Sequence, residues 1–435
     1  MEWGWDNARA ILGLILIVTI AWGFSENRKA FPWKIVLGAV GLQFAFALFI
    51  FLVPKLFGAD TLFGNNNEPN PVIKTLEDAT RYGTGFVFGY IGDNSSFPNE
   101  DVSPKPAFFF QILPIVIVVA ALSAILWHWR ILRLLTKAFA FIFAKTMGLG
   151  GATSLAVSAN IFMGMTEAPV LVKPYMKGMT RSEIFVLMTT GFATIAGSVL
   201  IIYTTFLADV MPNALAVLLT ASIIAAPAAV ALALTMVPET VAIHDRAHEP
   251  DFEYQSTMDA FATGASDGLK IVLNIATMLI AALALLFIAN VILGALPFTF
   301  GENDEKLSIQ MVLGWLFSPL MYMTGVPMSE AQTAGSLMGV KTVLTEFVAF
   351  IELADTPEEL LSDRSRIITA HAVCGFANFG SIGILIGGLT IIAPERRDVF
   401  LQLAWKTLIA GTLATCMSAC IAGALPAELF LGSAS

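Results

Sequence analysis

The chain alternates long apolar stretches with short polar connections. A helical membrane span needs roughly 17–25 mostly apolar residues. Stretches of this kind lie near 9–25, 33–53, 107–127, 183–207, 213–236, 271–296, 366–392 and 399–425. The pattern therefore predicts an all-α polytopic membrane protein with eight transmembrane helices.

Two further apolar stretches, near 146–176 and 323–352, have flanks that argue against full crossings. Basic side chains flank the first stretch on both sides, and acidic side chains flank the second. Cytoplasmic loops carry an excess of Lys and Arg, so a full crossing would leave one cluster on the wrong side. We expect two opposed re-entrant hairpins, the first dipping from the cytoplasm and the second from the outside.

The same charge pattern predicts the orientation of the chain. The first apolar run ends before Arg28 and Lys29, so that connection is expected inside and both termini outside. The segment Trp127–Lys145 carries basic residues among Leu, Ile and Phe, a pattern typical of a helix lying along the inner membrane surface.

Composition agrees with a membrane protein and excludes several other classes. Hydrophobic residues make up 57% and charged residues 13% of the 435 residues, whereas soluble domains average about 25% charged. The mean hydropathy is +0.77. A net charge of −9 gives no support for nucleic-acid binding. No metalloprotease or serine-nucleophile motif lies within the expected spans, so an enzyme is not expected.

The two hairpins belong to an internal repeat. Hairpin one contains Thr166–Glu167 and hairpin two contains Thr345–Glu346. Each is followed by a span with Phe-Ala-Thr/Asn and Gly-Ser in mid-course, at Phe192–Ser198 and Phe376–Ser381. Because the two copies are expected in opposite orientations, the pattern indicates an inverted repeat with broken helices, which is typical of secondary transporters.

The polar residues of this repeat point to a binding site. A charged residue at membrane depth costs about 2.5–3.5 kcal/mol on insertion scales, so Glu167 and Glu346 are expected to have a function. Freed carbonyls at a helix break can hold a cation, and freed N–H groups can meet a polar ligand. The alternative is that the small residues are close-packing points between helices.

Four blocks of residues carry a resemblance to a known family. They are Ser158–Pro169, Gly191–Ser198, Gly339–Phe350 and Cys374–Ile384. Together they resemble the concentrative nucleoside transporter family over roughly residues 107–425. The resemblance implies a homotrimeric, elevator-type transporter of a bacterial cytoplasmic membrane that takes up nucleosides with Na+ as coupling ion and without an organic cofactor.

The resemblance also implies roles for individual residues. Those expected to face the nucleobase are Met165, Thr166, Glu167 and Val199. Those expected to hold the sugar are Glu346, Asn378 and Ser381, with Phe376 packing nearby. The sodium ligands would be the side chains of Asn160 and Thr194 with carbonyls of Met163, Thr194 and Ile195.

Two departures from the family pattern leave an alternative open. The family has Gln where this chain has Met165, and Asn where it has Thr345. Base preference is therefore open, and the alternative is a proton-coupled or altered-specificity carrier for purine nucleosides, nucleobases or related compounds, with Glu167 carrying the proton. A passive channel is a third interpretation.

The repeat divides the chain into four expected regions. They are N-terminal scaffold spans with an external loop at 1–127, the interfacial helix with hairpin one and the first repeat at 128–236, a cytoplasmic connector with a scaffold span at 237–308, and hairpin two with the second repeat at 309–435.

Overall fold

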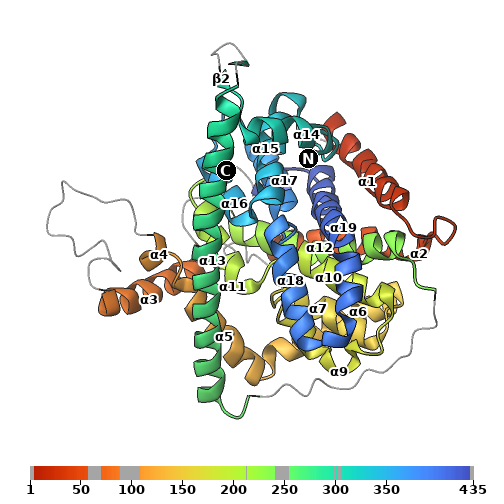
Figure 1. The fold of residues 1–435 in the computed structure, drawn as a ribbon, viewed down its shortest axis with the longest axis vertical. Helices are drawn as coiled ribbons and strands as arrows, with labels where there is room; N and C mark the ends of the chain where they lie inside the picture. The colour runs from red at the N-terminus through yellow and green to blue at the C-terminus, as the bar shows by residue number, and fades with distance from the viewer. Residues whose placement is uncertain are drawn as a thin grey trace.

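The structure is a computed structural model that describes residues 4–56, 70–88, 108–211, 213–240, 254–296, 299–300 and 305–431. Over these ranges the chain is helical, apart from a short antiparallel pair of strands, β1 (Thr299–Phe300) and β2 (Glu305–Lys306). The predicted all-α class is thus confirmed (Figure 1).

The first half of the chain runs from the N-terminal spans through one repeat. Its helices are α1 (Trp5–Gly23), α2 (Trp33–Leu56), α3 (Pro71–Phe88), α4 (Phe108–Gln111), α5 (Ile115–His128), α6 (Ile131–Met147), α7 (Gly151–Asn160), α8 (Ala168–Leu171), α9 (Lys173–Met176), α10 (Arg181–Ala193), α11 (Gly197–Leu207) and α12 (Ala214–Met236). Hairpin one is α7 with α8 and α9, and α10 and α11 are the two halves of a broken span.

The second half repeats this order. Its helices are α13 (Thr257–Gly294), α14 (Ile309–Met323), α15 (Met328–Val343), α16 (Glu346–Asp355), α17 (Asp363–Val373), α18 (Phe379–Ile392), the 3-10 helix η4 (Pro394–Arg396), α19 (Arg397–Ala424) and α20 (Glu428–Leu431). Hairpin two is α15 with α16, and α17 and α18 form the second broken span. The same order begins earlier than the sequence pattern indicates, since α5 and α6 precede hairpin one as α13 and α14 precede hairpin two.

The long apolar helices agree with the predicted spans. Among the described residues, seven helical segments are long and apolar enough to cross a membrane, and they correspond to seven of the eight predicted spans. The bent pair α14–α15 also passes by length and composition, but it contains the first arm of hairpin two and is not one of the predicted spans. The expected span at 366–392 is divided at 374–378 between α17 and α18, which is the predicted helix break.

Three boundaries differ from the prediction. The helix α13 begins at Thr257 rather than near 271, because the Ser256 side chain accepts a hydrogen bond from the Asp259 N–H at 3.1 Å and caps it. The helix α14 was not expected, and it too begins at a serine cap, Ser308. The helix expected along the membrane surface, α6, starts at Ile131 rather than Trp127, because Arg130 has a positive φ of 66° that separates it from α5.

The helices α12 and α19, together with the broken span α10–α11, are the most buried of the long apolar segments. The membrane-length segments around α12 and α19 are 89% and 94% buried, and they pack against each other and against α1, α2, α10 and α17. In contrast, α13 is only 12% buried over its apolar segment and packs mainly against α5. Figure 1 shows α13 standing along one side of the molecule, with α3 and α4 beyond it.

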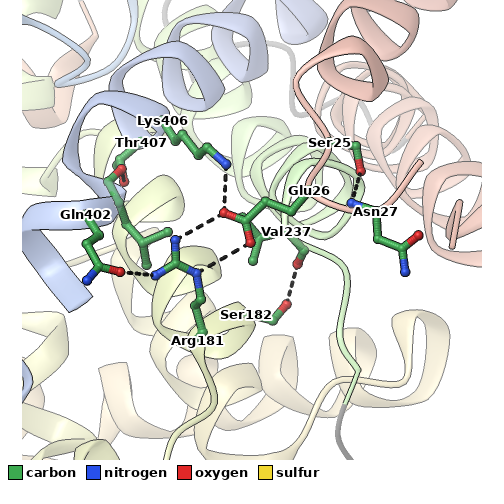
Figure 2. Close-up of polar contacts among 10 residues, drawn as sticks. Ser25, Glu26, Asn27, Arg181, Ser182, Val237, Gln402, Lys406 and Thr407 are labelled. Carbon is green, nitrogen blue, oxygen red and sulfur yellow. Dashed lines mark hydrogen bonds and ion pairs between the residues drawn. The ribbon is translucent and has the colours of Figure 1, made fainter. Parts of the chain in front are cut away.

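A charged cluster joins several helix ends at one end of the bundle. Glu26, in the connection after α1, accepts hydrogen bonds from Lys406 of α19 at 2.7 Å and from Arg181 of α10 at 3.1 Å. Arg181 also donates to Gln402 of α19 at 2.9 Å, and the Glu26 N–H donates to the Met236 carbonyl at 2.8 Å. Figure 2 shows Glu26 between the two cations. The cluster therefore ties α1, α10, α12 and α19 together.

Candidate functional site

The tip of hairpin one lies against the break between α10 and α11. The α7 helix ends at Asn160, and the residues up to Glu167 form turns before α8. The N–H of Gly197, the first residue of α11, donates to the Phe162 carbonyl at 3.2 Å. A Cβ at Gly191 would come within 2.9 Å of the Met165 Cβ, so only glycine lets α10 approach the tip this closely.

Hairpin two is capped at its tip. Thr345 is the N-cap of α16, and its hydroxyl accepts from the Val348 N–H at 3.3 Å. Threonine is a favourable N-cap residue, so Thr345 has a structural role at the tip of hairpin two. Glu346 follows as the first residue of α16, with its carboxylate at the positive end of the helix.

The second broken span starts again at an asparagine cap. Asn378 is the N-cap of α18, and its Oδ1 accepts from the Ser381 N–H at 2.8 Å. Its Nδ2 donates to Glu346 Oε2 at 2.9 Å. One side chain thus both starts the helix and links it to hairpin two.

The two hairpin tips and the two helix breaks meet at one cavity of about 180 Å³, which we call the central cavity. All eight residues expected to bind substrate line it, namely Met165, Thr166, Glu167, Val199, Glu346, Phe376, Asn378 and Ser381. The structure brings together residues that are more than 200 positions apart in sequence, counted from Met165 to Ser381. Their binding roles stay predictions.

Sequence reasoning missed one partner of the carboxylate. The Tyr203 hydroxyl donates to Glu346 Oε1 at 3.0 Å. Tyr203 belongs to α11 and is fully buried where this helix packs against hairpin two. Its ring stacks on Phe350, with centroids 4.3 Å apart. Tyr203 lies four residues after Val199, on the same face of α11, so helical periodicity could have found it.

The other missed wall of the central cavity comes from α13. Its lining residues are Ile271, Asn274, Ile275, Met278 and Leu279. These five lining residues belong to no motif, and only the tertiary arrangement places them beside the hairpins.

The residues expected to hold sodium lie on two segments that a hydrogen bond joins, from the Gly197 N–H to the Phe162 carbonyl. The tip of hairpin one and the break at 194–196 carry all four, and Asn160 and Thr194 are 0% and 2% exposed. The Asn160 Nδ2 donates to the Ala156 carbonyl at 3.1 Å, whereas its Oδ1 has no hydrogen-bond partner within the described part of the chain. An orphaned buried oxygen is costly, and a cation would satisfy it. The donor set of amide, hydroxyl and carbonyl oxygens fits a hard cation.

Three family models match the chain. A sodium-dependent nucleoside transporter C-terminus model matches residues 217–423, the corresponding N-terminus model matches 12–91, and a nucleoside recognition Gate model matches 109–210. Together they cover both repeats.

The chain belongs to the sodium-dependent nucleoside transporter family. An uncharacterized transporter of Haemophilus influenzae is 38% identical over 97% of each chain. The nucleoside permease NupC of Helicobacter pylori is 34% identical, also over 97% of each chain. A structure of CNTnw in an inward-facing substrate-bound state is 36% identical with a TM-score of 0.83, covering 98% of this chain and 99% of that chain.

Family membership confirms the fold class and the broad function inferred from sequence. The structural neighbours include inward-facing, outward-facing and intermediate states, and the chain shares the fold of these elevator-type transporters. The sodium-dependent nucleoside transporter family consists of nucleoside carriers and not of enzymes. The chain is therefore an integral membrane nucleoside transporter.

Proposed function

We propose that this chain takes up nucleosides across the bacterial cytoplasmic membrane by symport with Na+. The single observation that carries this proposal is the convergence of both hairpin tips and both helix breaks on the central cavity. It gives one chamber lined by the tip of hairpin two with Glu346 and by the tip of hairpin one with Glu167, and these two sets of polar groups suit a ligand with a sugar and a base.

The sugar end of the central cavity is built around Glu346. A carboxylate offers about four acceptor sites, and the Tyr203 hydroxyl and the Asn378 amide occupy one on each oxygen. The remaining sites are suited to ribose hydroxyl groups. The two protein donors also orient the carboxylate before substrate arrives, which lowers the entropic cost of binding.

The base end is formed by Met165, Thr166, Glu167 and Val199. The Glu167 Oε2 accepts from the Gly164 N–H at 3.2 Å, which holds the carboxylate at the hairpin tip. Met165 brings a polarizable thioether in place of an amide. We propose that the base is held here by shape and by few directed hydrogen bonds.

Coupling to sodium is supported by the Asn160 Oδ1, which has no hydrogen-bond partner within the described residues. This oxygen would lie 3.6 Å from a Cβ at Gly191, in the helix that leads to the break at 194–196. The proposal further includes an orientation with both chain termini outside the cell membrane and a homotrimeric assembly. It also includes the division of the chain into four regions, with boundaries after residues 127, 236 and 308. The close pairing of α5 with α13 supports a scaffold role for these two helices.

Uptake into proteoliposomes tests the proposal. Purified protein is given a panel of radiolabelled nucleosides with a sodium gradient or a proton gradient imposed separately. We expect accumulation against the nucleoside gradient only when sodium is present. Accumulation driven by protons in choline buffer would overturn sodium coupling, and equilibration without accumulation would indicate a channel.

A further inference from the structure

A second cavity adjoins the central cavity. It measures about 240 Å³ and is enclosed by α5, α6, hairpin one, α11 and α13. Glu167 and Ile271 line both cavities. Glu167 and Ile271 therefore lie at the boundary between the two cavities.

The position of the second cavity follows from the residues that α13 contributes. Gly264, Asp267 and Ile271 line the second cavity, and the central-cavity residues continue from Ile271 to Leu279. Steps of three or four residues keep these positions on one helix face, at about 5.4 Å per turn. The second cavity thus lies toward the N-terminal end of α13, beside the basic helix α6. The charge pattern places this end on the cytoplasmic side.

The walls of the second cavity carry hydrogen-bonding groups of both kinds. Trp127 is only 4% exposed, and its indole Nε1 has no hydrogen-bond partner among the described residues. Glu167 and Asp267 supply acceptors. Asp267 is paired with Lys270 at 2.8 Å, but its side chain is 50% exposed, so the pair is weak and leaves acceptor capacity free.

This chemistry favours one class of ligand. The described lining includes two carboxylates and no Lys or Arg, although Lys270 pairs with Asp267 and the Arg133 guanidinium lies 5.6 Å from the Trp127 ring centroid. The acidic groups that line the cavity itself favour a neutral ligand over an anion. Trp127, Phe162 and Tyr254 supply aromatic surface on which a planar base can stack. A neutral molecule with hydroxyl donors and a planar ring that accepts a hydrogen bond fits best, and a nucleoside has all of these features.

We propose that the second cavity is a nucleoside subsite, occupied after substrate leaves the central cavity toward the cytoplasm. In this subsite Trp127 Nε1 donates to the base and Asp267 accepts from a hydroxyl or amino group. The inference rests on the proposed function, because it takes the ligand to be the transported nucleoside.

Equilibrium binding of radiolabelled nucleoside to purified protein tests the subsite. The parent should show a tight and a weaker component. Glu346→Gln should weaken the tight component and keep the weaker one. Trp127→Phe combined with Asp267→Asn should do the reverse, lowering the affinity of the weaker component about 10-fold, the effect of losing two modest hydrogen bonds. Lys270→Gln is the matched control, since it removes the ion pair but keeps the carboxylate, and should leave both components unchanged.

The outcomes separate the two proposals. The subsite is overturned if neither the parent nor Glu346→Gln shows a weaker component. It is also overturned if the weaker component persists unchanged in the double variant. Both results leave the proposed function intact. A parent protein that binds no nucleoside overturns the proposed function itself. The tight component reports on folding of the double variant. If the double variant loses the tight component, the single variant Trp127→Phe is measured instead, because it keeps an aromatic ring and removes only the indole N–H donor. A weaker component that is unchanged in Trp127→Phe then overturns the subsite.

Discussion

At the residue scale, the central cavity depends on two carboxylates held by different means. Glu346 receives side-chain hydrogen bonds from Tyr203 and Asn378. Glu167 receives a backbone hydrogen bond from Gly164 within its own hairpin tip. The first carboxylate depends on three separate elements being in place, whereas the second moves with its hairpin. Substitutions at the two ends should therefore have different consequences.

Replacing the sugar-end carboxylate should weaken binding strongly. Glu346→Gln keeps the size of the side chain but removes the charge that accepts hydroxyl donors. Hydrogen bonds to charged groups are worth about 1.5–3 kcal/mol, so nucleoside affinity should fall about 10- to 150-fold. Equilibrium binding measures the change. Glu352→Gln, on the same helix but outside the lining of the central cavity, is the control, and near-parental binding by Glu346→Gln would exclude direct contact with substrate.

Met165→Gln should change the preference between bases. The introduced amide can pair with a base edge such as that of uracil in uridine. It should strengthen uridine binding by one net hydrogen bond, about 1 kcal/mol. Affinities of purine and pyrimidine nucleosides for both proteins check this. A uniform loss for every nucleoside with lowered thermal stability would instead mean that the amide is buried without a partner.

Asn160→Ala should reduce the sodium dependence of uptake more than it changes nucleoside selectivity. The substitution removes the unpartnered buried oxygen and leaves the lining of the central cavity unchanged. The sodium concentration that gives half-maximal uptake should rise, with the order of preferred nucleosides retained. Ser154→Ala, in the same helix but hydrogen-bonded to the Leu149 carbonyl, is the control. Equal sodium dependence in parent and Asn160→Ala would contradict the assignment.

At the scale of elements, small residues decide how closely helices approach. Gly264 and Gly268 form a Gly-x-x-x-Gly pattern in α13 and lie against α5, where an added Cβ would come within 2.7 Å of Ala124 Cβ or Ile117 Cα. Such patterns let membrane helices pack closely. Ser266 lies between these glycines within a continuous helix, so the Gly-x-Ser-x-Gly sequence here is a packing motif and not the strand-to-helix turn of a hydrolase.

The charged cluster around Glu26 should stabilise the bundle in a pH-dependent way. Partial burial by itself would raise the pKa of Glu26, but hydrogen bonds and charge from Arg181 and Lys406 outweigh it and hold the pKa below its ordinary value of 4.5. The ionised carboxylate therefore stabilises the fold above that pH, and the contribution is lost as the pH falls through the lowered pKa.

Thermal unfolding of the parent and Glu26→Gln checks this. The variant should be less stable at neutral pH by about 0.5–1 kcal/mol, the range of partly exposed ion pairs. The difference should shrink as the pH is lowered stepwise below 4.5. Glu359→Gln, an exposed acid between α16 and α17, should show no such difference. A stability gap that is independent of pH would contradict an electrostatic role.

At the scale of the whole molecule, the elevator fold requires the central cavity to become accessible from each side in turn. Ile384 lines the cavity and is 42% exposed, while Cys374, Cys416 and Cys420 are fully buried. In Ile384→Cys, a membrane-impermeant thiol reagent should label the cavity from either side of oriented vesicles, and nucleoside should protect it. The parent should stay unlabelled. Labelling from one side only, whatever the sodium and nucleoside conditions, would contradict alternating access.

Much of this architecture could be predicted from the chain alone. Membrane spans and hairpins follow from apolar length and flanking charge, because lipid excludes unsatisfied backbone and membranes retain basic loops inside. The paired Thr-Glu tips and mid-span Asn and Thr residues marked the site for a similar reason, since polar groups at membrane depth are costly unless they have a function. The early start of α13 and the presence of α14 escaped prediction because serine caps decide helix boundaries locally.

Only the tertiary structure decided which side chains meet. Tyr203 is one of many aromatic residues in apolar sequence, and its bond to Glu346 exists because α11 and hairpin two are packed together. The α13 wall of the central cavity, the second cavity and the Glu26 cluster each join segments far apart in the chain. Apolar periodicity specifies which face of a helix is buried, but the partner of that face is set by the packing of every other helix.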